Sequence, residues 1–332
     1  MKLLVTGGLG FIGSNFILDA LSRFPDYEII NIDAEIEGAT HSNLKDVKKN
    51  KKYKFVKGNI TNQLLVNNLV SKVDLVLNFA AESHVDRSIT SPKNFIKSNI
   101  IGVFTILESV RKHKKKIIQI STDEVFGSIM KGSATEEFPF NPSSPYSSSK
   151  ASAELLVKSY VKTYGIEAIV TRCTNNFGPR QHLEKLIPRT ILFAQNDQKI
   201  PIYGSGKAIR DWIYVQDHCN AILEIFEKGK WGETYNISAN NEINNLTIVK
   251  KILKILGKPS DFFYHTEDRP GHDLRYSLDS SKIRKHLKWK TKFVFDDALE
   301  QTVNWYLSNK NLLKKANSKT LVPIPWKSGT KK

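Results

Sequence analysis

The sequence predicts an α/β fold built on a doubly wound parallel sheet, followed by a smaller C-terminal α/β domain. Two observations carry this prediction. Over residues 1–174, short apolar runs typical of buried strands alternate with stretches that have the apolar spacing of helices. Beyond that point the chain is richer in Pro, Asn and Gly, and its regular stretches become shorter. A chain of 332 residues is long enough for both parts.

Apolar runs define the expected strands of the sheet. They span residues 2–8, 27–33, 54–60, 73–81, 116–121 and 167–173. Apolar residues at helical spacing predict helices over 11–24, 94–113 and 148–165. Two later pieces, 211–229 and 233–238, are regular enough to return to the main layer. The remainder of 175–313 is expected to form the smaller domain, and 314–332 a basic tail.

Composition narrows the classes of function. The apolar runs are too short for a membrane span and the first residues do not resemble a signal peptide, so we expect a cytoplasmic protein. Cys173 and Cys219 are the only cysteines, which predicts neither a disulfide framework nor a metal site. The net charge of +17 fits either nucleic-acid binding or a lysine-rich solvated surface. The lysines cluster in expected loops and helix ends without interleaved aromatic residues, so we expect no nucleic-acid partner.

The stretch TGGLGFIG lies between the first expected strand and the first expected helix. Gly8, Gly10 and Gly13 fit the pattern G-x-G-x-x-G, and Gly7, Gly10 and Gly13 fit a close variant. Glycines here let the backbone approach a pyrophosphate at the helix N-terminus. Asp33 ends the second strand twenty residues beyond Gly13, where a carboxylate bonds ribose hydroxyls and repels a 2′-phosphate. The arrangement predicts a Rossmann-type sheet that binds NAD.

Two further stretches carry groups suited to acid–base chemistry. In PYSSSK, Tyr146 and Lys150 share one helix face, and the ammonium and a positive nicotinamide ring would favour tyrosinate. In STDEVFG, Asp123 stands beside Glu124 directly after an apolar strand. Repulsion between adjacent carboxylates pushes their pKa values apart, so that one can be protonated while the other is charged. Both can reach one ligand only if the strand ends at Asp123, because successive strand side chains face opposite ways.

Several stretches together carry a family resemblance. They are TGGLGFIGS, AAESHVDRSI, STDEVFG, YSSSK, RCTNNFGPRQHLEKLIP, PIYGSGKAIRDWIYVQDH, YNISANNE and RPGHDLRYSLD. Over residues 1–308 the chain resembles the extended short-chain dehydrogenase/reductase superfamily and its NAD-dependent epimerase/dehydratase family. More narrowly, it resembles the dTDP-glucose 4,6-dehydratases. The resemblance implies that NAD is retained while a dTDP-glucose substrate becomes a 4-keto-6-deoxy sugar. It also implies a homodimer, formed by helix 94–113 and the helix of Tyr146.

The resemblance assigns a role to each candidate catalytic residue. Tyr146, with Lys150 beside it, takes the proton of the 4-hydroxyl while hydride leaves carbon 4 for NAD. Thr122 hydrogen-bonds that hydroxyl. Glu124 then removes the proton on carbon 5, and Asp123 protonates the hydroxyl that leaves carbon 6. The hydride returns to carbon 6.

The resemblance also implies two sets of binding residues, and it assigns no residue to a metal. The cofactor set is Gly7, Gly10, Phe11, Ile12, Gly13, Asp33, Asn59, Ile60, Ala80, Ala81, Glu82, Ser83, Ser98, Tyr146, Lys150 and Asn176. The substrate set is His84, Thr122, Asn175, Lys185, Leu186, Pro201, Ile202, Tyr203, Arg210, Asn245, Asp268, Arg269, Pro270, Gly271 and His272. Within it, Arg210 and Arg269 suit a diphosphate, because the guanidinium fork matches phosphate oxygens.

The sequence departs from the family pattern at two places near the cofactor. Residues 34–37 read Ala-Glu-Ile-Glu where the family usually has a Lys-Leu-Thr-Tyr-like stretch beside the adenosine ribose. Asn59 replaces an Asp expected near the adenine, and its carbonyl can accept a hydrogen bond without carrying charge.

Three alternative functions stay open at this point. A UDP-glucose 4,6-dehydratase is one, because the sequence does not decide between thymine and uracil. An epimerase or decarboxylase of the same superfamily is another, although the acid pair argues against it. A non-catalytic NAD-binding protein that holds nucleic acid on its basic surface comes from a different class. Such a protein could dispense with Tyr146, Lys150, Asp123 and Glu124, all of which are present.

Overall fold

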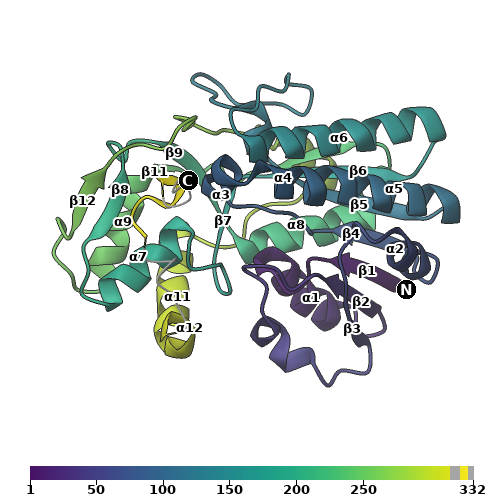
Figure 1. The fold of residues 1–332 in the computed structure, drawn as a ribbon, viewed down its shortest axis with the longest axis horizontal. Coiled ribbons are helices and arrows are strands. Elements are labelled where there is room, and N and C mark those ends of the chain that lie inside the picture. Colours follow the sequence, from purple (N-terminus) through teal and green to yellow (C-terminus); the bar gives the residue numbers. More distant parts are fainter. Residues whose placement is uncertain (315–321, 328–332) are drawn as a thin grey trace.

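A computed structural model of the protein describes residues 1–314 and 322–327. Its largest element is a seven-stranded sheet in which every neighbouring pair of strands is parallel (Figure 1). Across the sheet the strands are β3 (Tyr53–Lys57), β2 (Glu28–Asp33), β1 (Lys2–Thr6), β4 (Leu75–Asn78), β5 (Lys116–Thr122), β6 (Ala168–Cys173) and β10 (Thr234–Ile237). Strand addition proceeds outward in both directions from the boundary between β1 and β4. The predicted doubly wound parallel sheet is confirmed.

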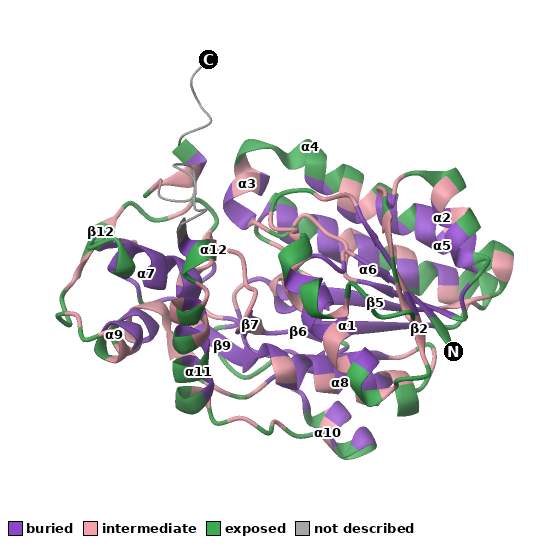
Figure 2. Ribbon diagram, turned by 90° about the horizontal axis from the view of Figure 1, so that it is seen from below, coloured by how far each residue is buried: buried purple, intermediate pink, exposed green. Residues whose placement is uncertain are grey.

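Helices cover both faces of this sheet. One face carries α1 (Phe11–Arg23), α8 (Val215–Lys228) and α10 (Ser281–Leu287), and the other α2 (Gln63–Val70), α5 (Gly102–His113) and α6 (Pro145–Tyr164). Strand β1 shows how: Leu3 and Val5 pack into the core with α1 and α8, whereas Leu4 packs into the core with α2, α5 and α6. Because the central strands are buried on both faces, as Figure 2 shows, they appear in sequence as continuous apolar runs.

The predicted helix 94–113 is present within a continuous helical stretch over 92–113, but this stretch is not α-helical throughout. The structure divides this region into α4 (Pro92–Phe95), a π-helical turn (Ile96–Ile101) and α5. The change to α-helix occurs at Gly102, where a Cβ atom would lie 2.4 Å from Cδ1 of Ile60. A glycine at this position therefore lets α5 approach the chain after β3 closely.

Helix α6 begins at Pro145, before the predicted start at residue 148. Ser144 caps it: the Ser144 Oγ accepts a hydrogen bond from the Ser147 N–H at 3.1 Å, and Ser147 Oγ accepts one from the Ser144 N–H at 2.9 Å. Proline at the first helical position is the usual partner of such a cap, so the signal was present in the sequence.

The smaller part of the molecule contains two further sheets. One is formed by β7 (Asn175–Phe177), β9 (Ile209–Tyr214) and β11 (Glu242–Asn244), and the other by β8 (Ile200–Tyr203) and β12 (Phe263–Thr266). Around them lie α7 (Leu186–Gln195), α9 (Asn245–Ile255), α11 (Phe295–Ser308) and α12 (Lys310–Lys314) (Figure 1). Between β9 and β11, α8 and β10 join the large sheet. Residues 211–214 belong to β9 and therefore to the smaller sheet, unlike the rest of the predicted returning segment.

The short elements complete the chain. They are η1 (His41–Val47), α3 (Val85–Thr90), η3 (Asp123–Phe126) and η4 (Pro325–Lys327). Of the predicted basic tail, residues 315–321 and 328–332 lie outside the described residues. Within the described residues, no helix combines the length and apolar character that crossing a membrane requires.

A buried ion pair joins α6 to the large sheet. Arg172 of β6 and Glu154 of α6 both have side chains that are 0% exposed. Arg172 donates to Glu154 through Nε at 2.9 Å and Nη2 at 2.7 Å, and through Nη1 to the Glu136 carbonyl at 2.9 Å. Its guanidinium also lies 4.8 Å from the ring of Phe126 in η3. One side chain therefore connects β6, α6 and η3.

We predict that Glu154→Leu lowers the free energy of unfolding by about 3–5 kcal/mol, because it leaves the Arg172 charge buried without a partner. The double variant Glu154→Leu, Arg172→Met should recover most of this loss, because neither charge then remains buried. Urea unfolding followed by circular dichroism measures both. A loss below about 1 kcal/mol in the single variant would contradict the prediction.

Candidate active site

The site lies at the carboxyl edge of the large sheet, where it meets the smaller part of the molecule. A cavity of ≈ 300 Å³ runs along the ends of β1, β2, β4 and β5, and a second of ≈ 170 Å³ extends toward β8 and α7. The residues that line both are His84, Glu124, Asn175, Glu184 and Lys185. The two cavities therefore adjoin at Glu124. Ligands of open parallel sheets bind at this edge.

The structure brings nearly all of the predicted site residues together. Every member of the cofactor set and all five candidate catalytic residues line the larger cavity. The substrate set lines one cavity or the other, with the exception of Asp268, Pro270 and Gly271. For these three residues a contact with the substrate stays a prediction. Asp268 lies behind His272 and accepts a hydrogen bond from its Nδ1 at 2.6 Å, so it orients a residue that does line the pocket.

The glycine loop is built for close approach. Gly7 has φ +68°, and a Cβ atom there would lie 2.7 Å from the backbone of Ala80. A Cβ on Gly13 would lie 2.5 Å from the carbonyl oxygen of Gly7. Helix α1 begins immediately after Gly10, and its first N–H groups receive no side-chain cap in the described structure. These N–H groups and the helix dipole suit a pyrophosphate.

Asp33 stands at the end of β2 with its side chain buried. Its Oδ2 accepts a hydrogen bond from the Leu9 N–H at 2.9 Å and its Oδ1 from the Glu35 N–H at 2.8 Å. Burial raises the pKa of Asp33, while these two backbone hydrogen bonds oppose the shift. Each oxygen keeps a further lone pair, so the carboxylate can accept from both hydroxyls of a ribose.

The two departures from the family pattern have structural consequences. The Oδ1 of Asn59 already accepts hydrogen bonds from the N–H and the hydroxyl of Thr61, both at 2.9 Å. Asn59 can therefore offer its amide N–H groups to an adenine. The sequence had instead suggested that its carbonyl would accept a hydrogen bond there. Glu37 pairs with Arg87 Nη1 at 2.7 Å, and Arg87 in turn contacts Glu184. An ion-pair chain thus links the loop after β2 to α3 and the smaller part of the molecule.

The end of β5 is the chemical centre of the site. The strand ends at Thr122 and the 3₁₀ turn η3 begins at Asp123. Thr122 Oγ1 donates to Asp123 Oδ1 at 3.1 Å and accepts from the Glu124 N–H at 3.3 Å. Gly127, with φ +64°, follows the turn. The extended strand therefore ends before Asp123, as predicted for two acids that act on one ligand. Asp123 and Glu124 line the same cavity.

The surroundings separate the two acids electrostatically. Burial, followed by the charge of Glu124, raises the pKa of Asp123 well above its usual range. Burial also raises the pKa of Glu124, but the nearby cations Arg269 and Lys185 oppose this shift. Burial therefore favours the protonated form of Asp123, whereas these cations favour the charged form of Glu124. Asp123 is then placed to donate a proton and Glu124 to accept one.

Tyr146 and Lys150 lie beside the acids on α6. Lys150 Nζ donates to the Ile120 carbonyl at 2.7 Å, and burial lowers the pKa of Lys150 to about 8. Burial and then the charge of Glu124 raise the pKa of Tyr146 well above its usual value, and a hydrogen bond with Thr122 opposes this only in part. These influences favour the neutral phenol, so the predicted tyrosinate depends on the positive nicotinamide ring as well as on the Lys150 ammonium. Ionising Tyr146 requires further positive charge at this point of the cavity.

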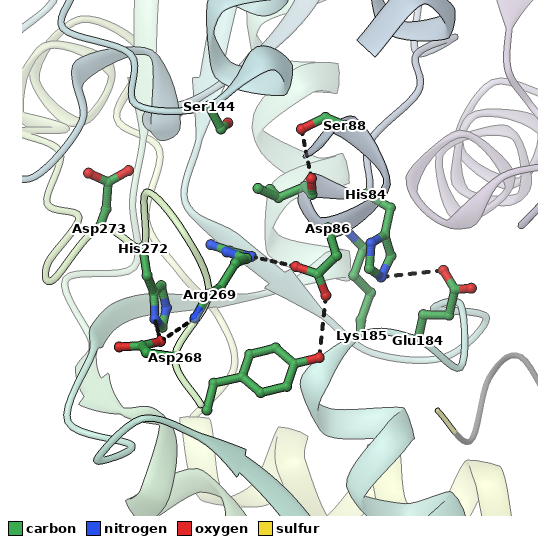
Figure 3. A network of polar contacts seen from close by, with 12 residues as sticks. His84, Asp86, Ser88, Ser144, Glu184, Lys185, Asp268, Arg269, His272 and Asp273 are labelled. Carbon is green, nitrogen blue, oxygen red and sulfur yellow. Dashed lines mark hydrogen bonds and ion pairs between the residues drawn. The ribbon is translucent and has the colours of Figure 1, made fainter. Parts of the chain in front are cut away.

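The second cavity is lined by paired charges (Figure 3). Arg269 Nη1 donates to Asp86 Oδ1 at 3.1 Å, and His84 Nε2 lies 3.3 Å from Glu184 Oε2. Burial lowers the pKa of His84 to about 3, so its imidazole is neutral at pH 7. Within the described structure, His84 Nδ1 and Arg269 Nε are buried without a hydrogen-bond partner. Because the neutral imidazole directs its Nε2–H at Glu184, its Nδ1 is an acceptor. The unpartnered Nε–H of Arg269 fits an anionic ligand such as a diphosphate.

Further unpartnered polar atoms line the larger cavity. Within the described part of the chain they are Ser121 Oγ, Asp123 Oδ2, Thr174 Oγ1, Asn175 Oδ1 and Gln181 Oε1. Together with the uncapped N-terminus of α1 and the open lone pairs of Asp33, they suit the many polar groups of a dinucleotide.

Sequence reasoning missed several residues of the site. Tyr276 lines the second cavity, with its hydroxyl 3.5 Å from Glu124 Oε2 and 2.8 Å from Asp273 Oδ2. Arg189 and Asp86 also line it, and Glu184 lies between the two cavities. Tyr276, Asp86 and Glu184 occur in stretches that carry the family resemblance. Their contacts, however, join residues far apart in the chain, which no local pattern reveals.

Known proteins share this architecture. The family model described as GDP-mannose 4,6 dehydratase matches residues 4–302. The dTDP-glucose 4,6-dehydratase of Mycobacterium tuberculosis is 43% identical over 315 residues, covering 94% of this chain and 95% of that protein. A crystal structure of DesIV, a dTDP-glucose 4,6-dehydratase from Streptomyces venezuelae with NAD and thymidine diphosphate bound, is 40% identical. It has a TM-score of 0.92 and covers 94% of this chain and 98% of that one.

An epimerase has the same fold at lower identity. The UDP-glucose 4-epimerase of Thermotoga maritima, solved with UDP-glucose, is 27% identical with a TM-score of 0.86. The alignment covers 93% of this chain and 100% of the epimerase. The match of the family model over most of the chain, and the identity to dehydratases over nearly its full length, agree with the geometry at the end of β5. The chain therefore belongs to the GDP-mannose 4,6 dehydratase family of nucleotide-sugar enzymes.

Proposed function

We propose that this protein is an NAD-retaining dTDP-glucose 4,6-dehydratase, a lyase that removes water from the sugar and leaves a 4-keto-6-deoxy product. The observation that carries the proposal is the placement of Asp123 and Glu124 in one cavity at the end of β5, beside Tyr146 and Lys150. Water elimination needs a base for one proton and an acid for the leaving hydroxyl. This pair of acids has environments that favour those two different protonation states.

The chain's own residues divide the work as follows. Tyr146 holds and moves the proton of the sugar 4-hydroxyl, and Thr122 orients that hydroxyl. Glu124 removes the proton at carbon 5, which the ketone at carbon 4 has made acidic. Asp123 gives its proton to the hydroxyl that leaves carbon 6 as water, and carbon 5 regains a proton when the hydride returns to carbon 6. NAD, when bound, supplies the acceptor for the hydride of carbon 4, its return to carbon 6, and the positive charge that favours ionised Tyr146.

The nucleotide of the substrate is proposed to lie in the second cavity. Arg210 and Arg269 face this cavity and suit the diphosphate. Pro201 to Tyr203 and Asn245 form its outer wall. Relatives and neighbours named as dTDP-glucose 4,6-dehydratases are 39–44% identical to this chain, whereas the UDP-sugar epimerases are 27–28% identical. This difference favours a dTDP-sugar dehydratase over an epimerase, with UDP-glucose as the second candidate substrate.

The first experiment incubates purified protein separately with dTDP-glucose and with UDP-glucose, without added NAD. Mass spectrometry should detect a product lighter by one water from dTDP-glucose. This result would support the reaction, the retained cofactor and the nucleotide preference together. Loss of water from UDP-glucose alone would correct the nucleotide. No loss of water from either substrate, in protein shown to contain NAD, would overturn the proposal.

Single substitutions should separate the two acids. With Glu124→Gln, the carbon 5 proton should no longer exchange with solvent deuterium, because the base is lost. With Asp123→Asn, that exchange should persist while water loss falls, because only the acid is lost. Each change should lower turnover about 100- to 10,000-fold. Mass spectrometry in D₂O measures both steps, and near-normal turnover of either variant would show that the roles are wrongly assigned.

The proposed assembly is a homodimer. The π-helical turn, α5 and α6 lie against one another and expose large apolar side chains: Ile96, Ile101, Phe104 and Leu155 are 52%, 48%, 44% and 56% exposed. An apolar surface of this kind is typical of a protein interface. Two copies packed through these helices would form a four-helix seam. Because α6 also carries Tyr146 and Lys150, the seam would lie directly behind the active site.

We predict that Phe104→Glu combined with Leu155→Glu converts the dimer to a monomer, since each buries a charge at the seam. Analytical ultracentrifugation measures the mass. Leu64→Glu is a matched control, because Leu64 lies on α2 and is 85% exposed. A wild-type protein that sediments as a monomer, or a double variant that remains dimeric, would contradict this assembly.

We also propose a cytoplasmic location. The supporting observation is that Cys173 and Cys219 are both buried and unpaired. Free buried thiols are usual in a reducing compartment.

A further inference from the structure

The segment Val322–Lys327 returns to the substrate half of the molecule. Its last turn, η4, lies against α3, and its Trp326 is only 6% exposed. The ring of Trp326 meets that of Tyr203 edge to face, with centroids 4.7 Å apart and planes at 86°. Edge-to-face aromatic pairs at this distance are attractive beyond the area they bury. The C-terminal segment is therefore packed on a residue that lines the second cavity.

Arg189 makes a second connection between this segment and the cavity. Its Nη2 donates to the carbonyls of Val322 at 2.6 Å and Pro323 at 3.3 Å. Its Nη1 donates to the hydroxyl of Tyr203 at 2.6 Å. Among the described residues Arg189 has no carboxylate within ion-pair distance, so these carbonyls and Tyr203 are its acceptors. Arg189 is largely buried, and this segment supplies two of its hydrogen-bond acceptors.

Tyr203 passes the connection on to the charged groups of the site. Its hydroxyl donates to Asp86 Oδ2 at 3.3 Å, and Asp86 Oδ1 accepts from Arg269 Nη1 at 3.1 Å. Figure 3 shows Arg269 directed at Asp86. Arg269 also carries the buried Nε that has no partner within the described residues. A continuous series of contacts therefore runs from the C-terminal segment to the guanidinium that best fits a phosphate.

We propose that segment 322–327 is part of the nucleotide site and that Trp326 is a positioning residue for it. Trp326 fixes the ring of Tyr203, and the carbonyls of Val322 and Pro323 fix Arg189. Together they set the position of Asp86 and Arg269 at the end of the cavity that receives a nucleoside diphosphate. This inference rests on the proposed function for the identity of the ligand. The chemistry at carbons 4, 5 and 6 takes place near Glu124, and Trp326 acts on it only indirectly, through Arg269.

The test compares Trp326→Ala, Trp326→Phe and wild type. With Trp326→Ala, KM for dTDP-glucose and Kd for dTDP should rise about tenfold, while kcat stays within about threefold. Such a split indicates lost binding that is equal in ground and transition states. Trp326→Phe keeps an aromatic ring and should restore most of the affinity. A structural role alone would not produce this split or this rescue.

Two further variants make the result decisive. Trp231→Ala is the matched control: Trp231 lies against Lys116, at the amino end of β5, and should change neither KM nor Kd. Arg189→Gln should raise KM like Trp326→Ala, and it replaces that variant if Trp326→Ala does not fold. Unchanged KM and Kd, or a fall in kcat alone, would overturn the inference.

Calorimetric titration with dTDP and with UDP keeps the inference separate from the proposed function. If wild type binds a nucleotide without turning over its glucose ester, the dehydratase proposal fails. The Trp326→Ala effect on Kd then still decides the inference. If wild type binds neither nucleotide, both are overturned.

Discussion

The buried pair of Arg172 and Glu154 is the joint on which the active site depends. Two elements that carry catalytic residues contact it: α6 supplies Glu154, and Phe126 of η3 lies over the guanidinium of Arg172. An ion pair without solvent holds its geometry tightly, because any movement leaves a charge uncompensated in a low-dielectric interior. The Arg172–Glu154 pair therefore helps to fix the position of Tyr146 on α6 relative to Glu124 on η3. The enzyme needs this rigidity, since the two groups must act on neighbouring atoms of one sugar.

Burial then decides the chemistry of the groups that this joint positions. Asp123, Glu124 and Tyr146 all have raised pKa values, and burial is the largest cause for each. Neutral forms are therefore favoured throughout the cavity unless a cation intervenes. Arg269 and Lys185 are the largest influences that lower the pKa of Glu124, and neither is among the main influences on Asp123. Burial alone would keep all three groups neutral. With these cations nearby, Glu124 can act as the base and Asp123 as the acid, whereas Tyr146 needs further positive charge to ionise.

The sequence predicted what local chemistry determines. Each recognisable pattern depends on residues that are adjacent or one strand apart: the glycine loop, Asp33 and the end of β5. At each of these places the conformation of the backbone explains why the pattern is needed. Resemblance added the residues of the distant loops, but it could not separate Asp268 from its neighbours. Asp268 faces His272, and that choice depends on the fold of the whole loop. Trp326 and Arg189 were missed because their contacts join residues that lie more than a hundred positions apart in the chain. The π-helical turn was missed because apolar spacing does not distinguish it from an α-helix.

The cations of the second cavity act on both the substrate and the base, which constrains how the site can work. Arg269, Lys185 and Arg210 all lower the pKa of Glu124, opposing its burial. A diphosphate bound to Arg210 and Arg269 would neutralise part of this field. We expect the pKa of Glu124 to rise when the nucleotide binds, because less positive charge then stabilises its carboxylate. A carboxylate of higher pKa is a stronger base. Binding of a nucleotide sugar would therefore strengthen Glu124 as a base as it brings the sugar within reach.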